Sequence, residues 1–132
     1  MRTGPPGSPV RNDALRIMII DDHEISRAAF VALLRAEGIN VTVGLAASDQ
    51  ALTAVRAHRP DVAIVDVTPA ADTGFAIARA LLALPTPPAV ILTSSIGRSH
   101  FGAGLNGYLF IAKADIRAAA IARLARSLQT DG

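Results

Sequence analysis

The stretch Ile17-Met18-Ile19-Ile20-Asp21-Asp22 is a short apolar run that ends in two acidic residues. The pattern returns at Val62-Ala63-Ile64-Val65-Asp66, and again at Tyr108-Leu109-Phe110-Ile111-Ala112-Lys113, where a lysine replaces the acid. Short runs that are apolar throughout are typical of strands covered on both faces of a parallel sheet. A structural role at a strand end would explain any one of these polar residues. It would not explain why all of them follow the same end of an apolar strand.

Alanine- and leucine-rich stretches separate the apolar runs, and this alternation predicts repeated β-α units around a parallel sheet. Predicted strands are 17–20, 41–45, 62–65, 89–92 and 108–111, and Thr42 interrupts the second as expected at a sheet edge. Predicted helices are 24–37 with Gly38 as its stop, 49–58 capped by Ser48, 75–84 ended by Pro85, and 115–128. The last predicted helix has an apolar stripe formed by Ile116, Ala120, Leu124 and Leu128. We expect its arginines to be solvated: Arg117, Arg123 and Arg126.

The segment 94–107, between the fourth and fifth predicted strands, is rich in glycine: Gly97, Gly102, Gly104 and Gly107. Each interior glycine weakens a helix by about 1 kcal/mol relative to alanine, so we expect any helix here to be short or irregular. Right-handed crossovers bring the carboxyl ends of all parallel strands to one edge. The predicted fold class is therefore α/β, a doubly wound five-stranded parallel sheet, for which we take the strand order 2-1-3-4-5.

Length and composition favour one globular domain, because the chain has 132 residues of which 51% are hydrophobic. We expect this domain at 15–129, after a flexible Pro/Gly-rich tail at 1–14 and before a tail or linker start at 130–132. The absence of cysteine excludes disulfides and thiolate metal sites. No apolar run approaches eighteen residues and no secretion signal is present, so we expect a cytoplasmic protein without a membrane span. A net charge of +2 and scarce aromatics do not favour nucleic-acid binding.

With the strand order 2-1-3-4-5, the polar residues after four strands should line one shallow pocket: Asp22, Asp66, Thr93 and Lys113. Two carboxylates 4 Å apart repel by about 4 kcal/mol at an effective dielectric of 20, so a hard cation is expected between them. Cysteine is absent, and His23, His58 and His100 do not have metal-ligand spacing. Mg²⁺ therefore fits the oxygen ligands better than zinc or copper does.

Lys113 is the only lysine among thirteen Lys and Arg residues, and its compact charge suits a phosphate oxygen. The Thr93 hydroxyl could donate to another oxygen, and Asp66 could attack phosphorus as a carboxylate nucleophile. Simpler roles remain open for each residue. Asp22 could cap the helix that begins near Glu24, Asp66 could start an Asx turn, and Lys113 could be a solvated strand end.

These residues resemble a bacterial response-regulator receiver domain of two-component signal transduction, with a flavodoxin- or CheY-like fold, over nearly all of 16–128. Ile19-Ile20-Asp21-Asp22-His23 resembles the family's acidic pair, and the interval from Asp22 to Asp66 is the one common in receivers. Gly74 stands where the family has the glycine that leads into helix 3. Ile91-Leu92-Thr93-Ser94 resembles the strand with the family's hydroxyl, and Phe110-Ile111-Ala112-Lys113 resembles the last strand with its lysine.

The resemblance implies that Asp66 accepts a phosphoryl group from a sensor histidine kinase with Mg²⁺ as cofactor. It places the ion on Asp21, Asp22, Asp66 and the Thr68 carbonyl, and it makes Thr93 and Phe110 the switch residues. The chain would then be a signalling phosphoprotein with at most autophosphatase activity, not an enzyme.

The expected partners are that kinase and a downstream protein or output domain, transcriptional for example, which is absent from this chain. The resemblance implies no direct contact with nucleic acid or membrane, and a homodimer stays open.

Two departures motivate an alternative. Pro69 lies three residues after Asp66, where the family usually has a proline four residues after the acceptor, and the interval from Thr93 to Lys113 is slightly short. The alternative is a degenerate receiver that acts as a phosphorylation-independent interaction module. A phosphatase-like or nucleotide-binding enzyme is disfavoured, because no glycine-rich loop follows the first strand and no second aspartate stands two residues after Asp66.

Overall fold

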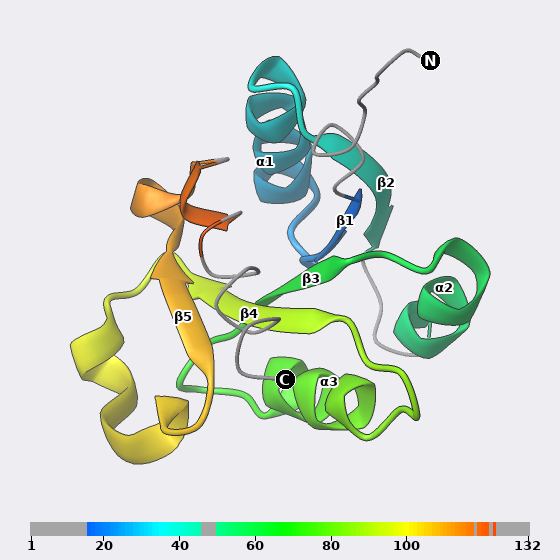
Figure 1. The fold of residues 1–132 in the computed structure, drawn as a ribbon. Coiled ribbons are helices and arrows are strands. Elements are labelled where there is room, and N and C mark those ends of the chain that lie inside the picture. Colours follow the sequence, from blue (N-terminus) through cyan, green and yellow to red (C-terminus); the bar gives the residue numbers. More distant parts are fainter. Residues whose placement is uncertain (1–15, 46–49, 118, 122, 124–132) are drawn as a thin grey trace, which may run out of the picture.

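The computed structural model describes residues 16–45, 50–117, 119–121 and 123 of the chain. Strands and helices alternate along it (Figure 1). Their order is β1 Arg16–Ile20, α1 Glu24–Ala36, β2 Asn40–Leu45, α2 Ala51–His58, β3 Val62–Asp66, α3 Thr73–Leu82, β4 Ala89–Ser94, the 3-10 helix η3 Arg98–Leu105, β5 Leu109–Ala112 and the 3-10 turn η4 Lys113–Asp115.

The five strands form one parallel sheet of order β2-β1-β3-β4-β5, which confirms the predicted topology and the place of β2 at an edge. The register puts Asp66 of β3 opposite Thr93 of β4, and Ser94 of β4 opposite Ala112 of β5. In Figure 1 the strands run through the middle of the molecule, with α1 on one side and α2 and α3 on the other. The carboxyl ends of β1, β3, β4 and β5 are therefore neighbours.

Helices cover both faces of the sheet. Alternate residues of a strand point to opposite faces. Met18 and Leu92 pack in a core cluster with residues of α2 and α3, whereas Ile17 and Ile91 pack in another that includes Leu34 of α1. This explains why the strands are apolar throughout. Among the described residues, no helix is long and apolar enough to cross a bilayer.

Helix boundaries differ from the predicted ones where capping and proline decide them. The structure has Gln50 as the cap residue of α2, whereas the predicted cap Ser48 lies outside the described residues. α3 spans Thr73–Leu82, so it begins before the predicted residue 75 and ends before 84. The early end follows from Pro85, because the residue before a proline is driven away from helical backbone angles.

The last helix was predicted to begin at Asp115, and the structure corrects this start. Residues 113–115 form a 3-10 turn, and Ile116 is extended, with φ −73° and ψ 123°. Helical backbone is found at 119–121 and 123, with Ile116 and Ile121 fully buried and Arg117 and Arg123 exposed. The remainder of the predicted stripe, Leu124 and Leu128 with Arg126, lies outside the described residues, as do the predicted tails 1–14 and 130–132.

The short helix expected between β4 and β5 is present as η3, a 3-10 segment interrupted at Gly102, where φ is 54° and ψ is −128°. Backbone of this kind is open to glycine and strained for other residues. The glycine content therefore explains both the presence of a break and its position.

Gly74, in the first turn of α3, is required by its closeness to the end of β3. A Cβ at this position would overlap the Asp66 carbonyl oxygen and lie 2.8 Å from Val67 Cγ1. We predict that Gly74→Ala lowers the free energy of unfolding by about 1–3 kcal/mol, because the backbone that carries Asp66 must shift. Urea unfolding followed by circular dichroism measures the change.

The matched control is Gly97→Ala. An added Cβ there meets nothing within 4 Å, and the φ of −66° suits any residue. Its stability should be unchanged or slightly higher. Equal stability of the two variants would contradict the predicted clash.

Candidate functional site

The acids after β1 and β3 and the lysine after β5 meet at the carboxyl edge of the sheet. Lys113 Nζ lies 3.1 Å from Asp21 Oδ2 and 3.1 Å from Asp66 Oδ1. The Asp21 side chain is 1% exposed and that of Asp66 is 10% exposed. β4 lies between β3 and β5, so the long lysine side chain crosses the end of β4 to reach both carboxylates. The sequence prediction named all three residues.

Ser26 completes this ion-pair network, and sequence reasoning did not find it. The Lys113 ammonium donates a hydrogen bond to Ser26 Oγ at 2.8 Å, and that hydroxyl donates to Asp21 Oδ2 at 2.9 Å. The backbone N–H of His23 donates to Asp21 Oδ1 at 2.9 Å. Ser26 lies in the first turn of α1, which begins soon after β1, and this nearness in sequence is the signal that could have indicated it. A buried carboxylate needs such donors.

The two buried carboxylates have opposite pKa shifts. Burial alone would raise the pKa of Asp21, but hydrogen bonds from the His23 backbone, Lys113 and Ser26 outweigh it, and the pKa is lowered. Burial raises the pKa of Asp66, and repulsion from Asp21 adds to this, while attraction by Lys113 offsets only part. Asp66 is therefore the carboxylate whose charge the fold compensates less well.

The Lys113 ammonium remains charged despite its partial burial. Burial would lower its pKa, but attraction by Asp66 and the hydrogen bond to Asp21 raise it overall. A fixed positive charge is thus held beside the less well compensated carboxylate.

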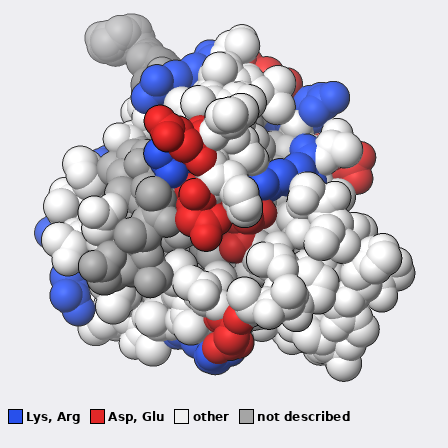
Figure 2. Space-filling model, turned by 180° about the vertical axis from the view of Figure 1, so that it is seen from behind, with Lys and Arg blue, Asp and Glu red and all other residues white. Residues whose placement is uncertain are grey.

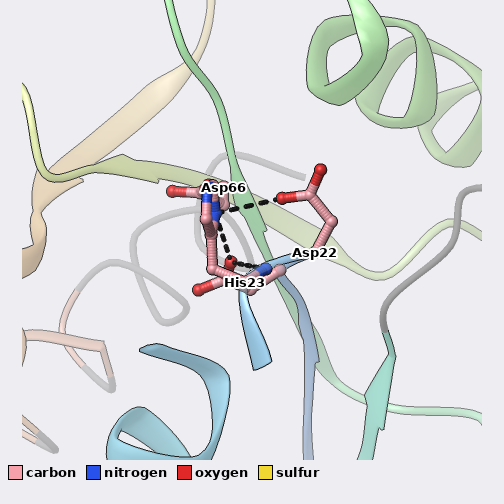
Figure 3. A group of neighbouring side chains, drawn as sticks. Asp22, His23 and Asp66 are labelled. Carbon is pink, nitrogen blue, oxygen red and sulfur yellow. Dashed lines mark hydrogen bonds and ion pairs between the residues drawn. The ribbon is translucent and has the colours of Figure 1, made fainter. Parts of the chain in front are cut away.

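Asp22 and His23 form the outer part of the site. The ligand atoms of Asp21, Asp22, His23 and Asp66 all lie within 4.8 Å of one another. His23 Nδ1 is 3.1 Å from Asp22 Oδ1, and Figure 3 shows the Asp22 carboxylate directed toward this imidazole. His23, which shows no metal-ligand spacing in the sequence, is thus placed beside these carboxylates by the fold. Asp22 does not cap α1, because the cap position is His23 and no side-chain cap bond forms.

Thr93 and Thr68 flank Asp66. Thr93 is 1% exposed, and its Oγ1 has no hydrogen-bond partner among the described residues. Thr68 begins a tight turn: its hydroxyl accepts the Ala70 N–H at 3.0 Å and its carbonyl accepts the Ala71 N–H at 3.4 Å. Buried polar groups normally have partners. The free hydroxyl beside Asp66 is thus able to donate to a group that enters the site.

Phe110 of β5 is half-buried and contacts η3. Its ring lies 5.9 Å from that of Phe101, and the Arg98 guanidinium carbon lies 5.2 Å above it. Phe101 in turn packs edge-on against Phe75 of α3, which also contacts Tyr108. A continuous group of aromatic side chains therefore joins β5, η3 and α3 close to the site.

Solvent reaches the outer part of the site. The side chains of Asp22 and His23 are 71% and 70% exposed. In the space-filling view from behind, acidic side chains gather near the middle of the face, with basic side chains above them (Figure 2). Three carboxylates offer oxygen ligands of the kind that hard divalent cations prefer, so the donor set fits Mg²⁺.

The chain belongs to the response regulator receiver domain family, whose family model matches residues 17–119. It is similar to the DNA-binding transcriptional activator DevR/DosR of Mycobacterium tuberculosis, with 39% identity over 82 residues, 61% of this chain and 38% of that protein. It is also similar to the DNA-binding response regulator MtrA of Mycolicibacterium smegmatis, with 35% identity over 79 residues, 60% of this chain and 34% of that protein. The chain thus spans little more than a third of the length of these relatives.

Solved receiver domains share the fold. The signal receiver domain of the response regulator NarL from Mycobacterium tuberculosis superposes with a TM-score of 0.69 at 28% identity, covering 85% of this chain and 96% of that one. A CheY-like receiver domain protein from Methanospirillum hungatei gives 0.64 at 18% identity, with 89% and 98% coverage. These matches confirm the predicted resemblance to receiver domains and the predicted CheY-like fold class. Receiver domains are signalling domains of two-component systems and bind Mg²⁺ at an acidic pocket.

The opposite pKa shifts of the two buried carboxylates predict opposite effects of removing them. Folding raises the pKa of Asp66 above its ordinary value of 3.8. At pH values above 3.8 the ionised side chain therefore destabilises the folded state. Asp66→Asn should therefore raise the free energy of unfolding at neutral pH, by on the order of 1 kcal/mol. The gain should shrink as pH falls and wild-type Asp66 becomes protonated. Urea unfolding without metal, from about pH 8 to about pH 4, measures it.

Asp21→Asn is the matched comparison. Folding lowers the pKa of Asp21 below its ordinary value of 3.8. At pH values above 3.8 the ionised side chain therefore stabilises the fold, and this contribution is lost as the pH falls through the lowered pKa. This variant should be less stable than wild type at neutral pH. The same sign of change in both variants would contradict the assigned electrostatics.

Ser26→Ala should weaken the network without touching Asp66. The substitution removes a donor to Asp21 and an acceptor for Lys113, so the Asp21 pKa should rise and stability should fall by about 1 kcal/mol. Carboxyl-carbon NMR titration measures the pKa. Ser99→Ala, at an exposed residue of η3, is the control and should leave both quantities unchanged.

Proposed function

We propose that this chain is a phospho-accepting receiver, in which Asp66 takes a phosphoryl group from the phosphohistidine of a sensor histidine kinase. The observation that carries the proposal is the Lys113 ammonium held 3.1 Å from both Asp21 and Asp66. It leaves Asp66 incompletely compensated, at the edge of the sheet, beside the buried Thr93 hydroxyl, which has no partner within the part of the chain that the structure describes. A site of this kind suits a phosphoryl group that brings its own negative oxygens.

In the proposed reaction, one carboxylate oxygen of Asp66 forms a bond to phosphorus as the bond from phosphorus to the kinase imidazole breaks. The electron pair of the broken bond stays on the imidazole nitrogen. Lys113 holds one phosphoryl oxygen by charge, and the Thr93 hydroxyl donates to another. The products are an aspartyl phosphate and a free kinase histidine.

Asp21, Asp22 and Asp66, with the Thr68 carbonyl, would hold the Mg²⁺ ion. The ion supplies neutralisation of charge on the phosphoryl oxygens. Asp21 is positioned for this by donors that keep it ionised, and Asp22 by its exposure at the rim. A raised pKa is expected for a carboxylate such as Asp66 when the cation that would neutralise it is not bound.

The output is proposed to pass through Thr93 and Phe110. Donation from Thr93 to the phosphoryl group would draw the end of β4 toward Asp66. Phe110 and its contacts with Phe101 and Arg98 would then repack, which shifts the population between two arrangements of η3 and β5. The recipient is a partner protein or an output domain in the cytoplasm. DNA-binding relatives favour a transcriptional one, and homodimerisation is compatible with it.

Phosphorylation of Asp66 is tested with acetyl phosphate. We expect intact-mass spectrometry to show a gain of one phosphoryl unit that requires Mg²⁺, because Asp66 is the incompletely compensated carboxylate beside Lys113. Asp66→Asn should show no gain, and Lys113→Met should show a strongly reduced one. Asp72→Asn, at an exposed ion pair with Arg79, is the control and should be modified like wild type.

An unmodified wild-type chain under these conditions would contradict the proposal. It would favour the degenerate receiver that binds partners independently of phosphorylation. Modification of Asp66→Asn to the wild-type extent would place the acceptor elsewhere.

A further inference from the structure

The two carboxylate oxygens of Asp21 and of Asp66 are divided between two nitrogen groups, the Lys113 ammonium and the His23 imidazole. Lys113 Nζ takes Asp21 Oδ2 and Asp66 Oδ1, each at 3.1 Å. His23 Nδ1 faces the remaining oxygens, lying 3.4 Å from Asp21 Oδ1 and 4.0 Å from Asp66 Oδ2. The ammonium and the imidazole thus lie on opposite sides of the acid pair. The oxygens left free by the lysine are those that a metal ion would use.

His23 Nδ1 also faces Asp22 Oδ1, at 3.1 Å (Figure 3). One nitrogen is therefore close to three carboxylates, and the four ligand atoms lie within 4.8 Å of one another. Ligands around an octahedral ion with bonds of about 2.1 Å are about 3 Å apart when adjacent and about 4.2 Å apart when opposite. The spacing of the four atoms needs little change to meet such a shell.

We propose that the His23 imidazole is a ligand of the cation site, so that the site binds late first-row divalent ions such as Ni²⁺ and Co²⁺ with an added preference over Mg²⁺. This rests on the proposed function only in placing a divalent ion between Asp21, Asp22 and Asp66.

The preference follows from the chemistry of the ligand. Mg²⁺ is a hard ion that binds oxygen, and imidazole nitrogen adds little to its affinity. Affinity for nitrogen-containing sites rises from Mn²⁺ through Co²⁺ to Ni²⁺. His23 is 70% exposed on its side chain, so it can turn toward an ion without breaking core packing. Three carboxylates with one imidazole therefore discriminate among divalent ions more than three carboxylates alone.

The test compares wild type, His23→Gln and His100→Gln by calorimetric titration at pH 8 with Mg²⁺ and with Ni²⁺, on protein without a histidine tag. A metal-bound imidazole must be unprotonated, which sets the pH. His100 is exposed on η3, outside the acidic cluster, and is the matched control. Pulsed EPR of the Mn²⁺-loaded chain adds a direct readout, because a coordinated imidazole gives nitrogen modulation. Circular dichroism checks that each variant is folded.

We expect His23→Gln to weaken Ni²⁺ binding by about tenfold or more while Mg²⁺ binding changes less than about twofold. Nitrogen modulation should disappear in this variant and persist in His100→Gln. An unchanged ratio of the two affinities would overturn the inference and leave the proposed function intact. Tighter binding of both ions by His23→Gln would also overturn it, because the imidazole would then compete with the cation. A wild type that binds neither ion would overturn the inference and the proposed function together.

Discussion

The balance of one ammonium against two carboxylates is the constraint on which the rest of the site depends. Asp21 and Asp66 end adjacent strands, so their charges are forced together, and burial makes their repulsion stronger than it would be in water. Lys113, which follows β5, reduces this repulsion by pairing with both carboxylates across the end of β4. The relief is unequal, since Asp21 receives additional hydrogen bonds from Ser26 and the His23 backbone. The pKa of Asp21 is therefore lowered, and that of Asp66 is raised.

This inequality links the fold to its chemistry. A parallel sheet with covered faces buries all but one end residue of β1, β3 and β4, and polar groups gather at the strand ends. Gly74 lets α3 approach the backbone of Asp66 at that end. The Asp66 carboxylate thus lies between the packed end of β3 and an exposed rim formed by Asp22 and His23. Precise placement of the donor atoms and access from solvent are both consequences of this location.

Beyond the site, the aromatic contacts from Phe110 to Phe101, Phe75 and Tyr108 give β5 and η3 a common packing surface. η3 is a 3-10 segment broken at Gly102, so it has fewer backbone restraints than a regular helix. If the proposed switch operates, a change at the end of β4 would reach this surface by repacking of rings rather than by movement of a rigid helix. The Arg98 guanidinium over Phe110 adds a charged contact to this surface.

Local pattern was enough to predict the strands and the irregular η3, because apolar runs and glycine content are properties of neighbouring residues. With the strand order 2-1-3-4-5 assumed, it also predicted that Asp66 and Lys113 lie at one edge, but it put Asp22 rather than Asp21 in the pocket with them. Helix ends at α3 and after Lys113 were less accurately predicted, since packing and turns shift them by a few residues. The contacts of Ser26 and His23 with the acids came only from the folded chain. Which oxygen of Asp21 faces the lysine and which faces the imidazole depends on side-chain rotamers, and those are chosen by contacts between segments up to 92 residues apart.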